Sequence, residues 1–251
     1  MLKVFADRGG TFTDLVIVTD NPKLPKEHFL VIPLPHQQWI IIHKLLSENP
    51  EQYPDAVIQG IRDILGIGKN EPIPTQEIEV VKMGTTVATN ALLERKGDRV
   101  LLAITKGFRD ALRIGYQNRP DIFALEIILP SMLYEQVIEI DERYDSQGNE
   151  LIPIKSEQVT QDLQRAYDDG IRSLAIVLMH SYAYPNHEKT VAKIAQEIGF
   201  TQISISHQVS PLIKLISRGD TTVVDAYLSP ILRRYVEEVA RQLPCLLYTS
   251  D

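Results

Sequence analysis

The residues with the clearest chemical potential form the run DRGGTFTD at residues 7–14, between two short apolar stretches. Two adjacent glycines let the backbone turn tightly and bring its N–H groups close to an anion. The hydroxyls of Thr11 and Thr13 can donate to phosphate oxygens, and the Asp7 carboxylate suits Mg²⁺, usually through water. We name residues 7–14 the glycine loop and predict that it binds phosphate and magnesium. The same residues also fit a hairpin in which the glycines only make the turn.

A second polar segment is the run MGTTVATNALLERKG at residues 83–97. A strand pattern runs into Gly84, and a threonine-rich turn then opens a helix. A helix start offers unpaired N–H groups and a partial positive charge, and Thr85 and Thr86 add hydroxyls, so an anion or carbonyl site is expected. A threonine-capped helix without a ligand is the structural alternative. Asn90 could cross-link this threonine turn, residues 83–90, or face a substrate.

A third candidate is the loop within residues 105–120, which holds Gln117 and Arg119 between glycine and proline. Arginine recognises carboxylates through paired hydrogen bonds, so these two residues could bind an acidic substrate. A loop arginine more often pairs with a structural aspartate.

Two further residues have weaker signals. His180 follows a strand pattern, where α/β proteins place functional groups, but a lone histidine is more often structural. No His/Cys spacing typical of a zinc site occurs. Arg218, in the run SRGD, either touches a ligand or caps neighbouring carbonyls.

Apolar residues alternate between strand-like and helix-like periods, which favours an α/β fold with a partly parallel sheet and helices on its faces. The expected strands are 4–6, 15–18, 80–83, 99–105, 137–144, 173–179 and 202–206, and the expected helices are 53–65, 87–96, 157–169, 186–198 with Asn186 as N-cap, and 222–242. Residues 21–38 hold four prolines, so an exposed loop or insertion is expected there. The pattern changes abruptly after residue 242, and we expect a truncated chain.

Composition narrows the class of protein. The chain has 251 residues, 44% of them hydrophobic, and a formal net charge of -7 without a basic stripe, which argues against nucleic-acid binding. No apolar run reaches the roughly 20 residues of a membrane span. One cysteine, Cys245, excludes an internal disulfide, and no cleavable signal pattern is present. A reducing cytoplasm is the expected location.

The glycine loop resembles the first phosphate motif of the actin-like, ribonuclease-H-fold ATPases, and its wording resembles the hydantoinase/oxoprolinase family, closest to its 5-oxoprolinases. The resemblance also covers residues 43–50, 83–97, 141–143, 178–182 and 218–228. It implies the N-terminal portion of a ribonuclease-H-like fold with a mixed sheet and flanking helices. It further implies an N-terminal domain at 1–210 and the start of a hydantoinase A-type domain at 211–251. Residues 21–38 depart from the family pattern.

The resemblance implies ATP and Mg²⁺ as cofactors. ATP would phosphorylate the amide oxygen of 5-oxo-L-proline, and water would then open the ring to give glutamate, ADP and phosphate. This chain would supply the first phosphate loop, with the second loop and the adenosine site elsewhere in a homodimeric full-length protein. The expected site residues are Asp7 and Thr11 for catalysis, Asp7 for metal, Gly9, Gly10, Thr11, Thr13 and Asp14 for nucleotide, and Gly84, Thr85, Thr86, Asn90, Gln117 and Arg119 for substrate.

Three other interpretations fit the same residues. A hydantoinase or an acetone-type carboxylase subunit would share the phosphate loop with a different substrate pocket. A non-catalytic, sugar-kinase-like or actin-like module would bind nucleotide without responding to 5-oxoproline. An incomplete chain would have no activity alone.

Overall fold

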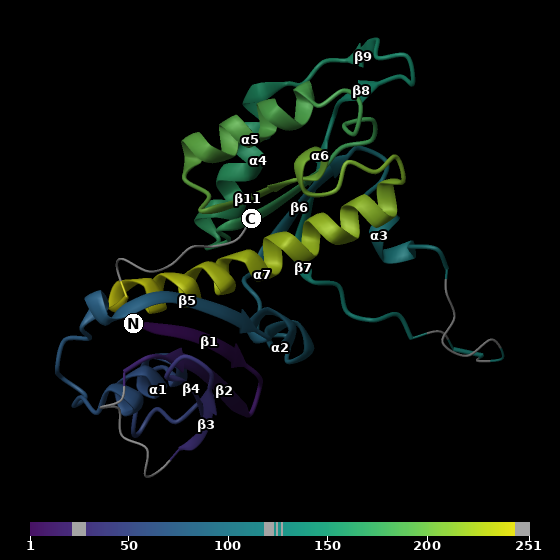
Figure 1. Ribbon diagram of the computed structural model, residues 1–251. Coiled ribbons are helices and arrows are strands. Elements are labelled where there is room, and N and C mark those ends of the chain that lie inside the picture. Colours follow the sequence, from purple (N-terminus) through teal and green to yellow (C-terminus); the bar gives the residue numbers. More distant parts are fainter. Residues whose placement is uncertain (22–28, 118–122, 124, 127, 244–251) are drawn as a thin grey trace. The chain divides into compact units, whose positions relative to one another are not determined.

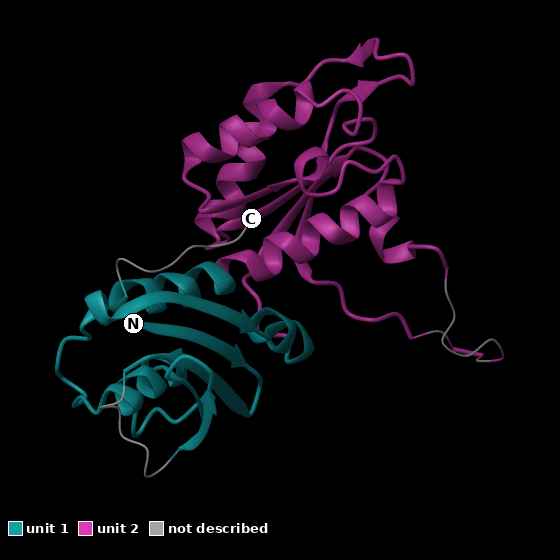
Figure 2. Ribbon diagram, viewed as in Figure 1, with its two compact units in different colours: residues 1–94, 231–251 teal, residues 95–230 magenta. Residues whose placement is uncertain are grey.

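The computed structural model describes residues 1–251 apart from 22–28, 118–122, 124, 127 and 244–251. The chain divides into two compact units (Figure 2). Unit 1 comprises Met1–Glu94 and Ile231–Asp251, and unit 2 comprises Arg95–Pro230. These limits come from contacts within each unit, so the expected family-domain boundary at residues 210/211 stays a prediction.

Unit 1 is built on a five-stranded mixed sheet with the order β3-β4-β2-β1-β5 (Figure 1). The strands are β1 (Leu2–Arg8), β2 (Phe12–Thr19), β3 (Leu30–Leu34), β4 (Gln38–Leu46) and β5 (Ile78–Thr85). The β1–β2, β2–β4 and β3–β4 pairs are antiparallel, and β5 runs parallel to β1. The short hairpin at the glycine loop places β1 and β2 side by side and antiparallel. A strand parallel to β1 needs a longer connection, and the segment between β4 and β5, which contains a helix, provides it.

One face of this sheet carries the core of unit 1. Alternate residues of β1 are buried, and they pack with α1 (Ala56–Leu65) and with Val239 on the last part of α7 (Leu215–Gln242). The Asp55 side chain caps α1 by accepting from the Ile58 N–H at 3.0 Å, and Gly66 ends it with a φ of 67°. The 3-10 turn η1 (Thr75–Glu77) precedes β5, and α2 (Val87–Leu93) follows it.

Unit 2 is built on four parallel strands with the order β11-β10-β6-β7. The strands are β6 (Val100–Thr105), β7 (Tyr134–Ile140), β10 (Ser173–Val177) and β11 (Gln202–Ile205), with a separate hairpin of β8 (Arg143–Tyr144) and β9 (Glu150–Ile152). Every residue of β6 and β10 is buried, as expected for a parallel sheet covered on both faces. The direction of winding reverses between β6 and β10, which makes unit 2 doubly wound.

Helices cover the unit 2 sheet. Residues of α4 (Ser156–Asp168) and α5 (Asn186–Ile198) share one core cluster with β6 and β10. Gly219, in the first part of α7, approaches Leu112 of α3 (Ala111–Ile114) and Val177 of β10 so closely that a Cβ would lie 2.6 Å and 3.3 Å from their side chains. The short helix α6 (Ser206–Val209) follows β11 directly. The expected α/β fold, with a mixed sheet and flanking helices, is confirmed, although the strands form two main sheets rather than one.

The expectation that residues 21–38 contain no regular element is wrong for their second half. Residues 30–34 form β3, an edge strand that pairs only with β4, and its Pro33 is tolerated there because an edge residue needs no second partner. The hairpin turns through His36 and Gln37, whose φ angles of 63° and 59° are left-handed. Residues 22–28 lie outside the described part of the chain.

Four other boundaries differ from the sequence expectations. The helix expected at 87–96 ends at Leu93, and Gly97 instead packs against the Tyr227 ring, where a Cβ would lie 2.1 Å from a ring carbon. The strand expected at 137–144 divides because Glu142 turns into the interior. Asn186 is the first residue of α5 rather than its N-cap. Helix α7 begins at Leu215 and contains Pro230.

None of the described helices combines the length and the apolar character needed to cross a bilayer.

Candidate functional site

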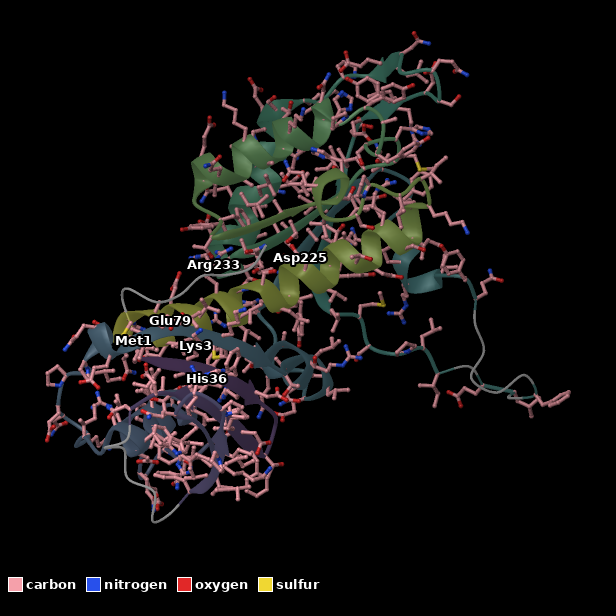
Figure 3. The ribbon with its side chains drawn as sticks, in the orientation of Figure 1. Met1, Lys3, His36, Glu79, Asp225 and Arg233 are labelled. Carbon is pink, nitrogen blue, oxygen red and sulfur yellow. The ribbon has the colours of Figure 1, made fainter. Side chains whose placement is uncertain are left out.

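Strand register brings the glycine loop and the threonine turn to the same edge of the unit 1 sheet. Asp7 lies opposite Asp14 on β2 and beside Gly84 on β5, and Arg8 lies beside Thr85. At the other end of the same strands, Lys3 pairs with Glu79 at 3.2 Å (Figure 3). Arg8 and Thr86 are 78 residues apart in sequence, and the parallel β1–β5 pairing brings the two segments together.

The carbonyl groups of the glycine loop are held by neighbouring segments. The Arg8 carbonyl accepts from the Thr86 N–H at 2.9 Å and from the Thr86 hydroxyl at 3.2 Å. The Gly9 carbonyl accepts from the Ser47 hydroxyl at 2.7 Å, and the Thr11 carbonyl accepts from the Ser47 N–H at 2.9 Å. Three of the carbonyls that would repel an anion are therefore already used in hydrogen bonds.

The N–H groups of Gly10 and Thr11 are left for a ligand. In a planar trans peptide the C=O and the following N–H point in opposite directions, so the Gly9 carbonyl, which faces the buried Ser47, directs the Gly10 N–H outward. Both residues are exposed, and within the described part of the chain neither N–H has a hydrogen-bond partner. Two successive free N–H groups in a tight loop are a typical anion-binding arrangement.

Asp7 is exposed at the end of β1, and its carboxylate makes no ion pair or hydrogen bond with any described residue. The facing carboxylate of Asp14 is neutralised by Lys44, whose Nζ lies 2.8 Å and 3.1 Å from its oxygens. Gly84 lies directly beside the Asp7 carboxylate, since a Cβ there would be in van der Waals contact with Asp7 Oδ1 at 3.6 Å. Mg²⁺ is commonly held by one or two carboxylates together with waters and phosphates, and this donor set fits that pattern. Among the described residues no group of three or more His, Cys, Asp or Glu could hold a metal.

Asn90 both cross-links the threonine turn and touches the glycine loop. Its Nδ2 donates to the Thr86 hydroxyl at 3.3 Å, and a Cβ on Gly10 would lie 3.0 Å from the same nitrogen. The Thr85 hydroxyl accepts from the Val87 N–H at 3.2 Å, whereas the Thr86 side chain makes no capping bond. These contacts give Asn90 and Thr86 a structural part in the loop; contact with substrate stays a prediction.

The structure corrects the expected role of Thr13. This residue is fully buried, and its hydroxyl lies 3.0 Å from Ser47 Oγ, on the core side of β2. Buried and more exposed residues alternate along β2, and Thr13 therefore shares the inner face with Leu15 and Ile17. The Thr13 hydroxyl is not available to a phosphate. The sequence pattern assigns Ser47 no separate role, because its only signal is a hydroxyl residue directly after an apolar run.

Arg8 connects the loop to α7. Its guanidinium lies 4.6 Å from the centre of the Tyr235 ring, and its Nε is buried without a hydrogen-bond partner among the described residues. The Tyr235 hydroxyl donates to the Met83 sulfur at 3.3 Å. Burial, followed by the nearby Asp55 carboxylate, raises the pKa of Tyr235. Stacking on a half-buried tyrosine fixes the base of the glycine loop.

The remaining candidates belong to unit 2. Gln117 is exposed with a φ of 57°, and Arg119 lies outside the described residues, so their part in substrate binding stays a prediction. His180 Nδ1 is buried and has no hydrogen-bond partner within the described ranges. Arg218 is fully buried and donates to the carbonyls of Leu178 and Met179, and burial lowers its pKa. Of its two alternatives, the structure favours carbonyl capping.

Comparison with known proteins places this geometry in a family. The model of the hydantoinase/oxoprolinase N-terminal region matches residues 3–199. The chain is 44% identical over 260 residues to 5-oxoprolinase 1 of Arabidopsis thaliana, covering 94% of this chain and 19% of that protein. The chain thus spans about a fifth of the length of this relative.

Two solved structures share the fold. A nucleotide-free acetone carboxylase superposes with a TM-score of 0.71 at 19% identity, over 96% of this chain and 34% of that one. An ATP-dependent caprolactamase from Pseudomonas jessenii gives a TM-score of 0.69 at 26% identity, over 96% of this chain and 33% of that one. With the family model matching most of its length and a 5-oxoprolinase 44% identical to it, the chain belongs to the hydantoinase/oxoprolinase family.

Proposed function

We propose that unit 1 binds the terminal phosphates of ATP, with Mg²⁺, at the glycine loop. The observation that carries this proposal is the pair of N–H groups on the exposed residues Gly10 and Thr11 that have no partner among the described residues, in the same loop as the unpaired Asp7 carboxylate. The strand order supports it, because β4, β2 and β1 are antiparallel neighbours in the sheet and β5 lies parallel to β1, an arrangement that fits the first half of a ribonuclease-H-like ATPase.

Each loop residue has a separate part in this proposal. The Gly10 and Thr11 N–H groups and the exposed Thr11 hydroxyl donate to phosphate oxygens, and Asp7 holds the metal, through water where needed. Bound Mg²⁺ would neutralise charge on the transferring phosphoryl group. Gly9 lets the loop turn, and Asp14 is held by Lys44 one strand away. Positioning and electrostatics supply most of the rate in phosphoryl transfer, so the loop requires no nucleophile of its own.

The polypeptide that carries this chain would hydrolyse 5-oxo-L-proline to L-glutamate. The five-membered lactam is a poor electrophile, and phosphorylation of its amide oxygen makes the ring open to water. Two similar proteins support a cyclic amide as substrate, because one is named a 5-oxoprolinase and the other an ATP-dependent caprolactamase. An acetone-type carboxylase is the second candidate, favoured by the shared fold with acetone carboxylase.

Substrate-stimulated ATP turnover separates these candidates. ADP release by the natural polypeptide that carries residues 1–251 is measured with 5-oxoproline, with caprolactam, and with acetone plus bicarbonate. We expect stimulation by 5-oxoproline together with glutamate formation in a one-to-one ratio to ADP. Stimulation by acetone plus bicarbonate alone would assign the protein to the carboxylases, and nucleotide binding without any stimulation would identify a non-catalytic module.

A further inference from the structure

We propose that Ser47 is a positioning residue for phosphate binding and that Thr13 acts through it. This inference rests on the proposed function and adds two residues that contact no ligand themselves. Ser47 follows the last residue of β4, and it is 3% exposed.

The hydrogen-bond donors around Ser47 can be assigned one by one. A serine hydroxyl has a single hydrogen, and that of Ser47 is donated to the Gly9 carbonyl at 2.7 Å. The 3.0 Å contact between the two hydroxyls therefore has Thr13 as donor and Ser47 as acceptor. The resulting chain runs from Thr13 through Ser47 to Gly9, and each bond in such a chain strengthens the next.

Ser47 fixes the carbonyls on both sides of Gly10. Its hydroxyl holds the Gly9 carbonyl, and its N–H holds the Thr11 carbonyl at 2.9 Å. Glycine rotates freely about its backbone bonds, so without these bonds the Gly9–Gly10 peptide can turn over. A turned peptide would present a carbonyl oxygen, instead of the Gly10 N–H, to the phosphate.

The position of Ser47 is itself rigid. The Tyr53 hydroxyl donates to the Leu46 carbonyl at 2.8 Å, and the Tyr53 N–H donates to the Asn49 carbonyl at 2.9 Å. Tyr53 and Thr13 are buried, so water has little access to replace the bonds that converge on Ser47. A rigid, buried anchor beneath a flexible exposed loop is the arrangement that preorganises an anion site.

The test measures binding of magnesium tripolyphosphate by calorimetry to the intact protein and four variants. Ser47→Ala and Thr13→Val remove the hydroxyl chain, and we expect about fivefold weaker binding for each, which corresponds to about 1 kcal/mol, the typical contribution of one hydrogen bond. Thr13→Ser keeps the donor and should rescue binding to within about twofold of the unmodified protein. Ile17→Val perturbs the same buried face of β2 without a polar bond, and its affinity should be unchanged.

If Ser47→Ala and Thr13→Val bind magnesium tripolyphosphate as tightly as the unmodified protein does, the inference is overturned. The proposed function is left intact by that result. If the unmodified protein itself fails to bind, the proposed function fails, and amide hydrogen exchange decides the inference separately. The Gly9 N–H, bonded to the Phe12 carbonyl at 3.0 Å, should then exchange about tenfold faster in Thr13→Val, while the Leu15 N–H is unchanged. Equal exchange of Gly9 in both proteins would contradict the inference, and this measurement also replaces Ser47→Ala if that variant does not fold.

Discussion

The two units use the polar residues at the carboxyl ends of their strands in opposite ways. In unit 2 these groups bond to one another. The buried Glu142 accepts from Thr105 and from His187, the latter at 2.6 Å. The buried Glu188 accepts from the Leu178 N–H at 2.9 Å and from the Ser206 hydroxyl at 2.6 Å.

In unit 1 the bonds converge on carbonyl groups and leave donors unused. The Gly10 and Thr11 N–H groups and the Asp7 carboxylate have no partner within the described residues, although they lie at an equivalent edge of a sheet. A polar strand end is therefore not by itself a sign of a ligand site. The distinguishing feature is which donors and acceptors the protein has left unpaired.

The largest effect is expected from breaking the satisfied network of unit 2 with Arg218→Met. This change leaves the fully buried Glu188 without its nearby arginine charge and removes one hydrogen-bond donor from each of the Leu178 and Met179 carbonyls. We expect a loss of about 3–5 kcal/mol in the free energy of unfolding, measured in urea. Arg165→Met, which removes a largely exposed partner of Asp162, should cost roughly 0–1 kcal/mol. A loss below about 1 kcal/mol for Arg218→Met would show that the network is not needed for stability.

A smaller effect, on binding rather than stability, is expected from Gly10→Ala. The new Cβ would lie 3.0 Å from Asn90 Nδ2 at the exposed surface of the glycine loop. Because the amide of Asn90 can move, the fold should tolerate the change, but the loop shifts and magnesium tripolyphosphate should bind about tenfold more weakly, or about 1.4 kcal/mol. Gly68→Ala is the matched control, since its Cβ would lie 3.1 Å from Glu71 Oε1. Equal affinities of the two variants would separate Gly10 from the site.

The smallest effect near neutral pH is expected from Tyr235→Phe, whose consequence appears only in alkaline solution. The native pKa of Tyr235 lies above its ordinary value of about 10 because of burial. Above pH 10 the unfolded chain therefore loses this proton before the folded chain does, and stability falls as the pH rises, by up to about 1.4 kcal/mol per pH unit. Tyr235→Phe should remove this part of the fall above pH 10 and leave the pH dependence below 9 unchanged, as measured by unfolding at fixed pH values. An identical alkaline slope in both proteins would contradict the burial of this hydroxyl.

The difference between the units also explains what the sequence could predict. The glycine loop was found because its chemistry is local, within eight consecutive residues. The burial of Thr13 was also readable, since it alternates in step with Leu15 and Ile17, but its hydroxyl was assigned to phosphate instead. The β3 edge strand was not predicted, because its proline disfavours a regular element.

Other parts of the site were not accessible from local pattern. Ser47 lies 34 residues from Thr13, and Tyr235 lies 152 residues from Met83. Lys44 meets Asp14 only through the β2–β4 register. Each of these contacts depends on strand order and helix packing, which a single sequence without homologues does not specify.

The most direct test of the account follows the backbone resonances of Gly10 and Thr11 while ATP and Mg²⁺ are added to the protein. We predict that both N–H signals shift and saturate together, that the effect requires Mg²⁺, and that Asp7→Asn removes the magnesium dependence without altering the spectrum of the core. Signals that stay in place at saturating magnesium ATP, or an Asp7→Asn protein that responds as the unmodified protein does, would contradict the central claim.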